Sequence, residues 1–536
     1  MAKKVAVIGA GASGICAIKC CLDEGLEPTC FERSNDFGGL WRFKEKPDLK
    51  TASIYKTLII NTSKEMMCFS DFPIPDDFPN YMHHSKIWKY FKMYVDHFGL
   101  MKYIQVETSV CSVKKRPDFA TSGQWDVTTK TSNGEEKTAV FDAVLVCTGH
   151  HCDPNLPLDS FPGIEKFKGR YLHSREYKSP VEFEGKRVIV IGIGNSGGDL
   201  SVEVSRTASQ VFLSTRRGAW IINRVATNGY PVDMVRTCRA VYALRYILPY
   251  PVQCSWMESQ LNQRFNHKNY SLQPEHRVLS QHPTVNDDLP NRIISGTVIV
   301  KPNVKEFTET AAVFEDGTVE ENIDVVIFAT GYRFSYPFLE DSIIEVRNNI
   351  TDLYKYVFPP RLEQPTLAVI GLVQPLGAIM PVSEIQSRWA ARVFKGLAKL
   401  PSAGAMMADI IKKKEDLNRR YVKTQRHTIQ IDYIDYMDEI AEILGVKTNM
   451  LKLLLRNPVL AWKVFFGPCT PYQFRLTGPG KWGGAEKAIM TQWDRVVKPT
   501  MTRPVKARQS SFPVLLVLSV LILVVAFFLF NLLPLY

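Results

Sequence analysis

A glycine-rich turn placed directly after a short apolar run constrains the fold of this chain more than any other feature. The run covers residues 5–8 (Val-Ala-Val-Ile) and is typical of a buried parallel strand. Gly9, Gly11 and Gly14 then form the pattern G-x-G-x-x-G. The first glycine allows a tight turn, the second lets the backbone approach a pyrophosphate, and the third lets the next helix pack close to the strand. We therefore expect a dinucleotide-binding fold whose helix begins near Ser13 and points its N–H groups at phosphate.

An acidic residue stands where such a fold needs one. A second strand, predicted over Pro28–Phe31, ends directly before Glu32, which lies 18 positions after Gly14. A carboxylate at the end of this strand accepts both ribose hydroxyls of an adenosine. A glycine pattern alone is a weak signal. Strand, glycines, helix, strand and acid in register together predict a bound dinucleotide.

Two further stretches are predicted to approach the same nucleotide. The paired glycines Gly38 and Gly39 indicate a second close approach of the backbone. Asn61–Ser63 follow the apolar run Leu58–Ile60, and we expect them at the end of a strand that faces the site; an ordinary turn is the alternative. The residues assigned to the first nucleotide are Gly9, Ala10, Gly11, Ala12, Ser13, Gly14, Glu32, Arg33, Gly39, Leu40, Trp41, Ile60, Asn61 and Thr62.

A later part of the chain repeats this pattern. An apolar strand over Arg187–Ile191 leads into Gly192, Gly194 and Gly197, and the helix that follows is predicted to run to Arg206. The repeat predicts a second dinucleotide-binding unit. The residues assigned to the second nucleotide are Gly192, Gly194, Asn195, Ser196, Gly197, Gly198, Thr215, Arg216, Thr330 and Gly331.

The residues after the next predicted strand, 211–214, distinguish the two nucleotides. Thr215 takes the position that Glu32 has in the first motif, and Arg216 and Arg217 follow it. An acid repels a 2′-phosphate, whereas arginine binds it. One unit thus favours a plain ribose and the other a phosphorylated one, so the natural pair is FAD first and NADPH second. The alternative is that the two arginines belong to a solvated loop.

Strand patterns and breaks divide the chain into domains. Residues 142–149 and 324–331 each read as a buried strand that ends on glycine, and 366–371 is a further strand candidate. The proline-rich stretch 153–162 resembles a linker. We predict an α/β protein with two Rossmann-like domains, an inserted subdomain and a C-terminal transmembrane helix. The predicted boundaries are 1–154 and 331–445 for the FAD-binding domain, 155–213 and 297–330 for the NADPH-binding domain, 214–296 for the inserted subdomain, 446–511 for a membrane-associated region and 512–536 for the anchor.

The last part of the chain is strongly apolar. Residues 512–530 carry no charge over 19 positions, and about 20 helical residues span a ~30 Å hydrocarbon core. Lys506 and Arg508 precede the run and no charge follows it, so the positive-inside rule places the body of the protein in the cytosol. A buried core helix is the alternative. Residues 450–466 mix apolar and basic side chains and lie either on a membrane surface or in the core.

Composition narrows the functional class. A chain of 536 residues is too long for one core. The net charge of +12 reflects either a generally basic surface or a preference for anionic cofactors and an anionic membrane face, and no basic–aromatic pattern indicates nucleic acid. The eleven cysteines show neither a Cys-x-x-Cys pair nor zinc spacing, so we expect buried free thiols, a reducing compartment and no metal site. Lys3 and Lys4 lead straight into the first motif, which predicts no signal peptide.

Four residues before the second glycine motif resemble a family signature. Phe167, Gly169, His173 and Tyr177 match Phe-x-Gly-x-x-x-His-x-x-x-Tyr, the signature of the flavin-containing monooxygenases. With both glycine motifs and residues 329–332 (Ala-Thr-Gly-Tyr), the resemblance covers essentially the whole chain. It is strongest to the fifth mammalian isoform, around residues 218–220 and 280–283. The related Baeyer–Villiger class usually ends the signature with tryptophan.

The resemblance implies a mechanism and a location. NADPH reduces FAD by hydride transfer, the reduced flavin captures dioxygen as a C4a-(hydro)peroxide, and bound NADP⁺ shields that adduct from water. Small lipophilic substrates are then oxygenated, and some NADPH is consumed to form hydrogen peroxide. Asn61 is implied to lie near the flavin, and Asn195 near the nicotinamide and the substrate. The family also implies a C-terminal anchor in the endoplasmic reticulum membrane. The oligomeric state stays open, a homo-oligomer included.

His282 is the third candidate catalytic residue. Most mammalian members of the family carry glutamate at this position. An imidazole removes a negative charge and titrates near neutrality, which favours Baeyer–Villiger oxidation of ketones. Tyr177 instead favours the N- and S-oxygenation of the other family members, and His282 then only shapes an access loop. Two other classes are a flavin disulfide reductase, for which the cysteine pair after Gly39 is missing, and a non-enzymatic redox sensor, which would consume no oxygen with NADPH.

Overall fold

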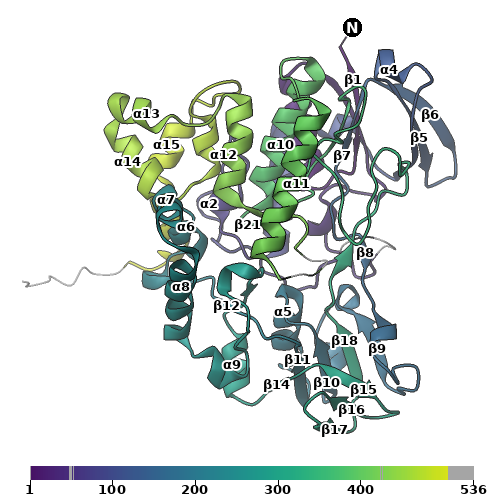
Figure 1. Cartoon of the computed structure of the whole chain (residues 1–536), viewed down its shortest axis with the longest axis vertical. Coiled ribbons are helices and arrows are strands. Elements are labelled where there is room, and N and C mark those ends of the chain that lie inside the picture. The colour runs from purple at the N-terminus through teal and green to yellow at the C-terminus, as the bar shows by residue number, and fades with distance from the viewer. Residues whose placement is uncertain (1, 48–50, 52, 423, 425–426, 505–536) are drawn as a thin grey trace, which may run out of the picture.

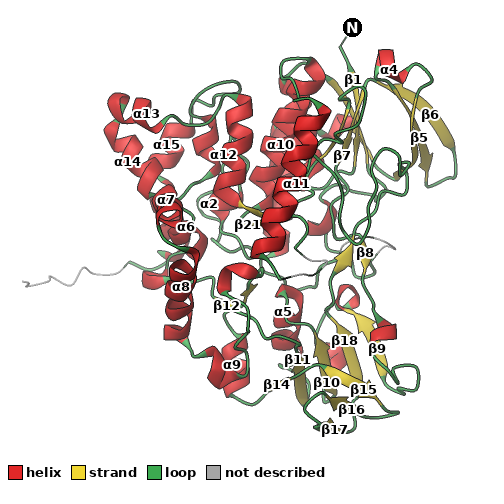
Figure 2. Ribbon diagram, in the orientation of Figure 1, coloured by secondary structure: helices red, strands yellow, loops and turns green. Residues whose placement is uncertain are grey.

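The computed structural model of the chain contains two α/β halves, each built around a five-stranded parallel sheet (Figure 1, Figure 2). It describes residues 2–504 except 48–50, 52, 423 and 425–426. In Figure 1 the sheet with β1 and β7 lies in the upper half and the sheet with β10 and β18 in the lower half, with β8 between them. The expected α/β fold with two Rossmann-like sheets is confirmed.

The first sheet has the order β20-β7-β1-β2-β3. Side chains of its central strand alternate between two cores: Val5 and Val7 belong to one cluster of buried residues, and Ala6 and Ile8 to another. Burial on both faces explains why this strand is apolar throughout. The strands are β1 (Lys4–Ile8), β2 (Glu27–Phe31), β3 (Ile104–Gln105), β7 (Ala143–Val146) and β20 (Leu367–Val369), all parallel.

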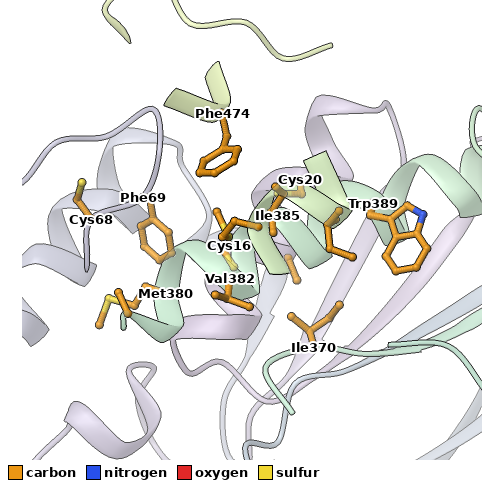
Figure 3. Close-up of a cluster of buried hydrophobic side chains, with 14 of the residues drawn as sticks. Cys16, Cys20, Cys68, Phe69, Ile370, Met380, Val382, Ile385, Trp389 and Phe474 are labelled. Atoms are coloured by element: carbon orange, nitrogen blue, oxygen red, sulfur yellow. The ribbon is translucent and has the colours of Figure 1, made fainter. Parts of the chain in front are cut away.

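A helix from late in the chain completes the first half. The glycine motif leads into α1 (Ala12–Asp23), which packs against α10 (Ile379–Lys395), while α12 (Tyr433–Leu444) covers α10. Figure 3 shows Cys16 and Cys20 among the apolar side chains between these helices. All eleven cysteines are free, and most are buried as expected. Burial raises the pKa of the Cys16 and Cys20 thiols, so they stay protonated as packing groups.

The second sheet has the order β14-β11-β10-β18-β9 and is also parallel throughout. Its motif helix, α5 (Asn195–Val204), ends two residues before the predicted Arg206, because the Arg206 and Thr207 N–H groups donate to carbonyls only three residues back. The strands are β9 (Arg170–His173), β10 (Arg187–Ile191), β11 (Gln210–Ser214), β14 (Val298–Lys301) and β18 (Val325–Phe328).

Two segments that cross between the halves pair with each other. Part of the predicted linker, β8 (Asp153–Pro154), forms an antiparallel pair with β19 (Tyr332–Arg333). The signature residue His173 joins this crossing, since its Nε2 lies 2.9 Å from the Gly331 carbonyl oxygen. Tyr177 is buried and packs edge-on against Tyr55 of the first half, with ring centroids 5.7 Å apart. The signature therefore contributes to the junction of the two halves.

The remaining elements surround the two sheets, and the predicted domain boundaries stay a prediction. The helices are α2 (Lys64–Met67), α3 (His84–His97), α4 (Phe119–Ser122), α6 (Val232–Arg236), α7 (Arg239–Ile247), α8 (Tyr250–Arg264), α9 (Leu289–Ile294), α11 (Ala403–Arg420), α13 (Met450–Arg456), α14 (Pro458–Phe466), α15 (Ala485–Met490) and α16 (Gln492–Val497). The strands are β4 (Thr108–Lys115), β5 (Trp125–Thr131), β6 (Glu136–Phe141), β12 (Ile221–Ile222), β13 (Thr284–Val285), β15 (Val304–Phe307), β16 (Ala312–Phe314), β17 (Val319–Glu320), β21 (Gln374–Leu376) and β22 (Gln430–Asp432).

Residues 450–466 form two short helices with one buried and one exposed apolar face. Leu460 and Val464 of α14 are buried, whereas Leu455 is 81% and Trp462 64% exposed. One face of α14 therefore packs in the core, and contact of the exposed face with a membrane surface stays a prediction. No helix within the described ranges is both long and apolar enough to cross a bilayer. The predicted anchor, 512–536, lies outside the described residues.

Candidate functional site

A cavity of about 830 Å³ is lined by residues from both halves of the molecule. Its wall includes segments that follow the carboxyl ends of β1, β7 and β20, and the first residues of α5. Ligands of open parallel sheets bind at this edge. The predicted site residues that line the cavity are Gly9, Gly11, Ala12, Ser13, Glu32, Arg33, Gly39, Leu40, Trp41, Ile60, Asn61, Thr62, Asn195, Ser196 and His282.

The first glycine motif has the geometry of a phosphate cradle. Gly9 has φ +98°, and a Cβ there would lie 2.9 Å from the Cys147 carbonyl oxygen. A Cβ on Gly14 would lie 1.8 Å from the Gly9 oxygen, so only glycine lets α1 pack this close. A Cβ on Gly11 would meet nothing nearer than 3.7 Å, which leaves its backbone open to the cavity. These residues fit the pyrophosphate of a dinucleotide, with Gly14 and Ala10 behind the wall rather than in it.

Glu32 is held at the cavity wall by backbone and hydroxyl donors. Its Oε2 accepts the Ala10 N–H at 2.8 Å, and its Oε1 accepts the Ser34 N–H at 2.9 Å and the Ser34 hydroxyl at 2.7 Å. The side chain is buried apart from its cavity face. A carboxylate has about four acceptor positions, so Glu32 keeps capacity for a ribose hydroxyl. The geometry fits the predicted adenosine site.

The second motif repeats the glycine geometry at a different place. Gly192 has φ +104°, and a Cβ on Gly197 would lie 1.7 Å from the Gly192 oxygen. Arg216 is exposed, and the described part of the chain places no carboxylate within ion-pair distance of it. Thr215 Oγ1 accepts the Gly218 N–H at 3.1 Å. The predicted residues that do not line the cavity are Ala10, Gly14, Gly192, Gly194, Gly197, Gly198, Thr215, Arg216, Thr330 and Gly331.

Asn61 reaches the cavity from a turn, so the prediction that it lies at a strand end is wrong. The only strand-like pairing described here is one isolated bridge of Ile59 with His83, so residues 58–60 form no strand. The chain then enters α2 at Lys64, directly after Ser63. Arg224 Nη2 donates to Asn61 Oδ1 at 2.6 Å. A guanidinium only donates, so the amide oxygen faces Arg224 and the amide NH₂ stays available as a donor. No local sequence signal marks Arg224.

Asn195 is connected to the segment that contains His282 by a hydrogen bond to β13. The Val285 N–H donates to Asn195 Oδ1 at 2.8 Å, and His282 lies three residues before Val285 on the same cavity wall. The His282 N–H donates to His427 Nε2 at 3.4 Å. The structure thus brings all three candidate catalytic residues, Asn61, Asn195 and His282, to one cavity.

Asp199 is a cavity residue that the sequence reasoning missed. It accepts the Tyr55 hydroxyl at 2.9 Å and the Asn286 amide at 2.9 Å, and so connects α5 to the first half. Burial raises the pKa of Asp199 to about 6. A carboxyl group with such a pKa can hold or release a proton near neutrality. Its place two residues after Gly197, the last glycine of the second motif, was the available signal.

Comparisons with known proteins identify the family of the chain. The family model described as "Flavin-binding monooxygenase-like" matches residues 2–532. The chain is 65% identical to flavin-containing monooxygenase 5 of Mus musculus over 526 residues, 98% of each chain, and 57% identical to dimethylaniline monooxygenase [N-oxide-forming] 2 of Macaca mulatta over 531 residues, 98% of this chain and 99% of the relative. A crystal structure of cyclohexanone monooxygenase from Rhodococcus bound to NADP⁺ shares the fold, with TM-score 0.57, 18% identity, and coverage of 83% of this chain and 98% of that chain. The chain belongs to the flavin-binding monooxygenase-like family and is a flavoprotein monooxygenase.

Proposed function

We propose that this enzyme uses FAD and NADPH to transfer one oxygen atom from dioxygen to small lipophilic substrates, and that its preferred reaction is Baeyer–Villiger oxidation of ketones to esters. One observation carries the preference for ketones: the imidazole of His282 lines the same cavity as Asn61 and Asn195. The family pattern has glutamate at the His282 position, so this cavity has lost a negative charge that most members carry.

The chain's own residues hold and position the reactants. Glu32 and the turn at Gly11 bind the adenosine and pyrophosphate of FAD, and Thr215 with Arg216 binds the 2′-phosphate of NADPH. When bound, FAD and NADPH supply the electron transfer and the activation of dioxygen. Asn61 donates its amide N–H toward the reacting oxygen, and Asn195 orients the nicotinamide. Neither amide titrates, so both hold their donors across the physiological pH range.

The two candidate reactions need opposite electrostatics. An amine or sulfide attacks a protonated, electrophilic oxygen, whereas a ketone must be attacked by an anionic oxygen. A carboxylate in the cavity opposes that anion. An imidazole at position 282 is neutral or cationic and donates a hydrogen bond, which stabilises negative charge as it develops on the substrate oxygen.

The test is His282→Glu, assayed with an aliphatic ketone and a thioether side by side. We expect ester formation to fall about tenfold while sulfoxidation holds or rises, since one hydrogen bond to a developing charge contributes roughly 1.5–3 kcal/mol. His282→Gln is the matched control, because it changes the shape of the side chain without adding charge. If both reactions change together in His282→Glu, the residue only shapes an access loop.

N- and S-oxygenation is the second candidate function. Tyr177 keeps the signature of the amine- and sulfide-oxygenating members, and a relative at 57% identity is named for N-oxide formation. Product analysis with NADPH, oxygen, a tertiary amine, a thioether and a ketone decides between the two. Faster turnover of the amine or thioether than of the ketone would favour this second function. Hydrogen peroxide released per NADPH measures the oxidase side reaction.

We also propose that residues 512–536 anchor the enzyme in the endoplasmic reticulum membrane, with the catalytic body in the cytosol. The exposed apolar residues of α13 and α14 support a nearby membrane surface, as do Tyr246 and Ile247 of α7, which are 78% and 77% exposed. Helix α14 packs on α7, and Figure 1 shows both on the same side of the molecule. One apolar side toward the bilayer suits lipophilic substrates.

A further inference from the structure

A part of the cavity wall that the cofactor motifs do not supply contains two arginines. Arg236 ends α6 and Arg245 lies near the end of α7, and both line the cavity together with Met257 and Leu279. Most other residues of this part are apolar or uncharged. Two cationic side chains in the wall of a cavity for lipophilic substrates are stable there only if anionic groups or water compensate their charge.

Arg236 has no anionic partner in the described part of the chain. Its Nη1 is buried and makes no hydrogen bond, and no described carboxylate lies within ion-pair distance of the guanidinium. Asp233, one turn earlier on α6, instead accepts the Ser63 N–H at 2.7 Å and the Met234 N–H at 3.0 Å. Burial and the neighbouring Arg245 both lower the pKa of Arg236. A guanidinium stays charged at neutral pH even so.

The neighbouring arginines of α6 and α7 show the contrast. Arg239 forms a bidentate pair with Asp438 at 2.6 and 2.8 Å. Arg245 lies 3.9 Å from Asp432 and stacks over the Tyr242 ring at 4.2 Å. Arg236 is the one described arginine of these two helices without a carboxylate, and it is the one whose terminal nitrogen is buried and unsatisfied. Burial of a cation without an anionic partner costs free energy. An anion that enters the cavity can therefore pair with Arg236 without displacing another carboxylate.

We infer that the cavity binds lipophilic substrates that carry an anionic head group, with Arg236 holding the head group while the apolar wall holds the chain. The inference rests on the proposed oxygenation of lipophilic substrates and names their class. A guanidinium binds a carboxylate or a phosphate through paired N–H donors. The side chains of Met257 and Leu279 contact the alkyl chain, which leads from Arg236 toward Asn61 and Asn195 on the same cavity wall.

Binding of unreactive probes to the FAD-loaded enzyme tests the anion site without turnover. Isothermal titration uses octanoic acid, octyl phosphate and 1-octanol, each with wild type, Arg236→Met and Arg236→Lys. We expect Arg236→Met to weaken octanoate binding at least tenfold and to change 1-octanol binding less than twofold. Arg236→Lys should restore part of the octanoate affinity, because it keeps the charge but not the paired donors. The octyl phosphate arm shows whether a carboxylate or a phosphate head group is preferred.

Arg361→Met is the matched control, since Arg361 is exposed and does not line the cavity. It should leave all three affinities unchanged. Equal octanoate affinity in wild type and Arg236→Met would overturn the inference, and so would parallel losses for octanoate and 1-octanol. Flavin content and the circular dichroism spectrum report whether each variant is folded. If Arg236→Met does not fold, the Arg236→Lys variant decides the question. An unchanged ratio of octanoate affinity to 1-octanol affinity in Arg236→Lys, compared with wild type, counts against the inference.

Turnover then separates this inference from the proposed function. With 7-oxooctanoic acid and 2-octanone as paired substrates, Arg236→Met should raise the KM for the keto acid at least tenfold and leave the KM for 2-octanone unchanged. If neither ketone yields an ester although octanoate binding depends on Arg236, the Baeyer–Villiger proposal fails and the anion site stands. If esters form but octanoate binding ignores Arg236, the anion site fails and the proposed reaction stands.

Discussion

At the scale of single residues, the orientation of Asn61 depends on a partner far away in the chain. Arg224 donates to the amide oxygen of Asn61 at 2.6 Å and is itself held by Asp287 at 2.9 Å. This contact decides which end of the amide is offered to the cavity. We propose that Asn61 donates to the reacting oxygen, which its amide can do only while Arg224 holds its carbonyl oxygen.

Arg224→Met is predicted to uncouple NADPH consumption from oxygenation. Loss of a hydrogen bond of about 1 kcal/mol frees the Asn61 amide to turn, so the ratio of product to NADPH consumed should fall about three- to tenfold. FAD content should stay unchanged, since Arg224 does not line the cavity. The assay compares product, NADPH and hydrogen peroxide in one reaction. Arg224→Lys keeps one donor and should recover part of the coupling; full coupling in Arg224→Met would show that Asn61 needs no such support.

The proposed binding of the NADPH 2′-phosphate by Arg216 also depends on a single side chain and its charge. Arg216→Ala should raise the KM for NADPH about ten- to a hundredfold, since charge-assisted hydrogen bonds contribute roughly 1.5–3 kcal/mol. The KM for NADH should hardly change, because NADH lacks the 2′-phosphate. Steady-state kinetics with both nucleotides measure this difference. An equal loss with both cofactors would contradict the assignment.

At the scale of secondary-structure elements, the buried His173 stabilises the junction of the two halves only when its imidazole is neutral. His173 at the end of β9 is buried, and its two ring nitrogens lie 2.9 Å from the Gly331 oxygen and 3.3 Å from the Arg175 nitrogen. Burial lowers the pKa of His173 from 6.5 to about 4. Between about pH 6.5 and pH 4, the imidazole of His173 is therefore protonated in the unfolded chain but stays neutral in the folded protein.

This pKa shift predicts a loss of stability in acid. At pH 7 His173 is neutral in both states, and its contribution is fully present. As the pH falls from about 6.5 to 4, the unfolded state binds the proton first, so the free energy of unfolding decreases by roughly 3 kcal/mol at most from this residue. His173→Gln should remove that part of the slope in urea unfolding at pH 7, 6 and 5. His97→Gln, at an exposed position, serves as the control and should keep the slope.

At the scale of the whole molecule, the C-terminal segment up to α16 is part of the first half. Arg475 Nη2 pairs with Glu384 of α10 at 2.7 Å and with Asp71 at 3.0 Å, and all three side chains are almost completely buried. Arg495 pairs with Glu65 at 2.6 Å. Removal of one partner from such a pair leaves a buried charge without compensation.

Two truncations with opposite outcomes follow. A chain that ends before Phe512 should keep FAD and extract from membranes more easily than the full chain, since the described cores end before that point. A chain that ends before Pro471 loses Arg475 and Arg495, and should fail to retain FAD. Flavin absorbance after purification, and the detergent needed for extraction, measure both results. Loss of FAD in the longer truncation would show that the last residues belong to the fold.

Local sequence patterns were sufficient to predict the two dinucleotide-binding motifs and the α/β fold class of this protein. The order of strand, glycine turn and helix at β1 and β10 could be predicted from short stretches of sequence, because it depends partly on local contacts such as the approach of Gly14 to the Gly9 oxygen. This approach depends on short-range sterics, whereas the turns at Gly9 and Gly192 also face the distant Cys147 and Ala329 carbonyls. The same local reasoning failed at Asn61, because an apolar run cannot show whether its backbone finds a strand partner.

The tertiary structure alone decided which side chains share the cavity and which charges lack partners. The contacts of Asn61 with Arg224, of Asn195 with Val285 and of Asp199 with Tyr55 join residues that are 90 or more positions apart. Whether a charge is paired depends on every element that packs around it, which is why Arg239 and Arg236 look alike in the sequence but differ in the fold. The sequence determined that two dinucleotides bind, since backbone geometry is local. Packing determined what else the cavity accepts, since that depends on the elements that the fold brings together.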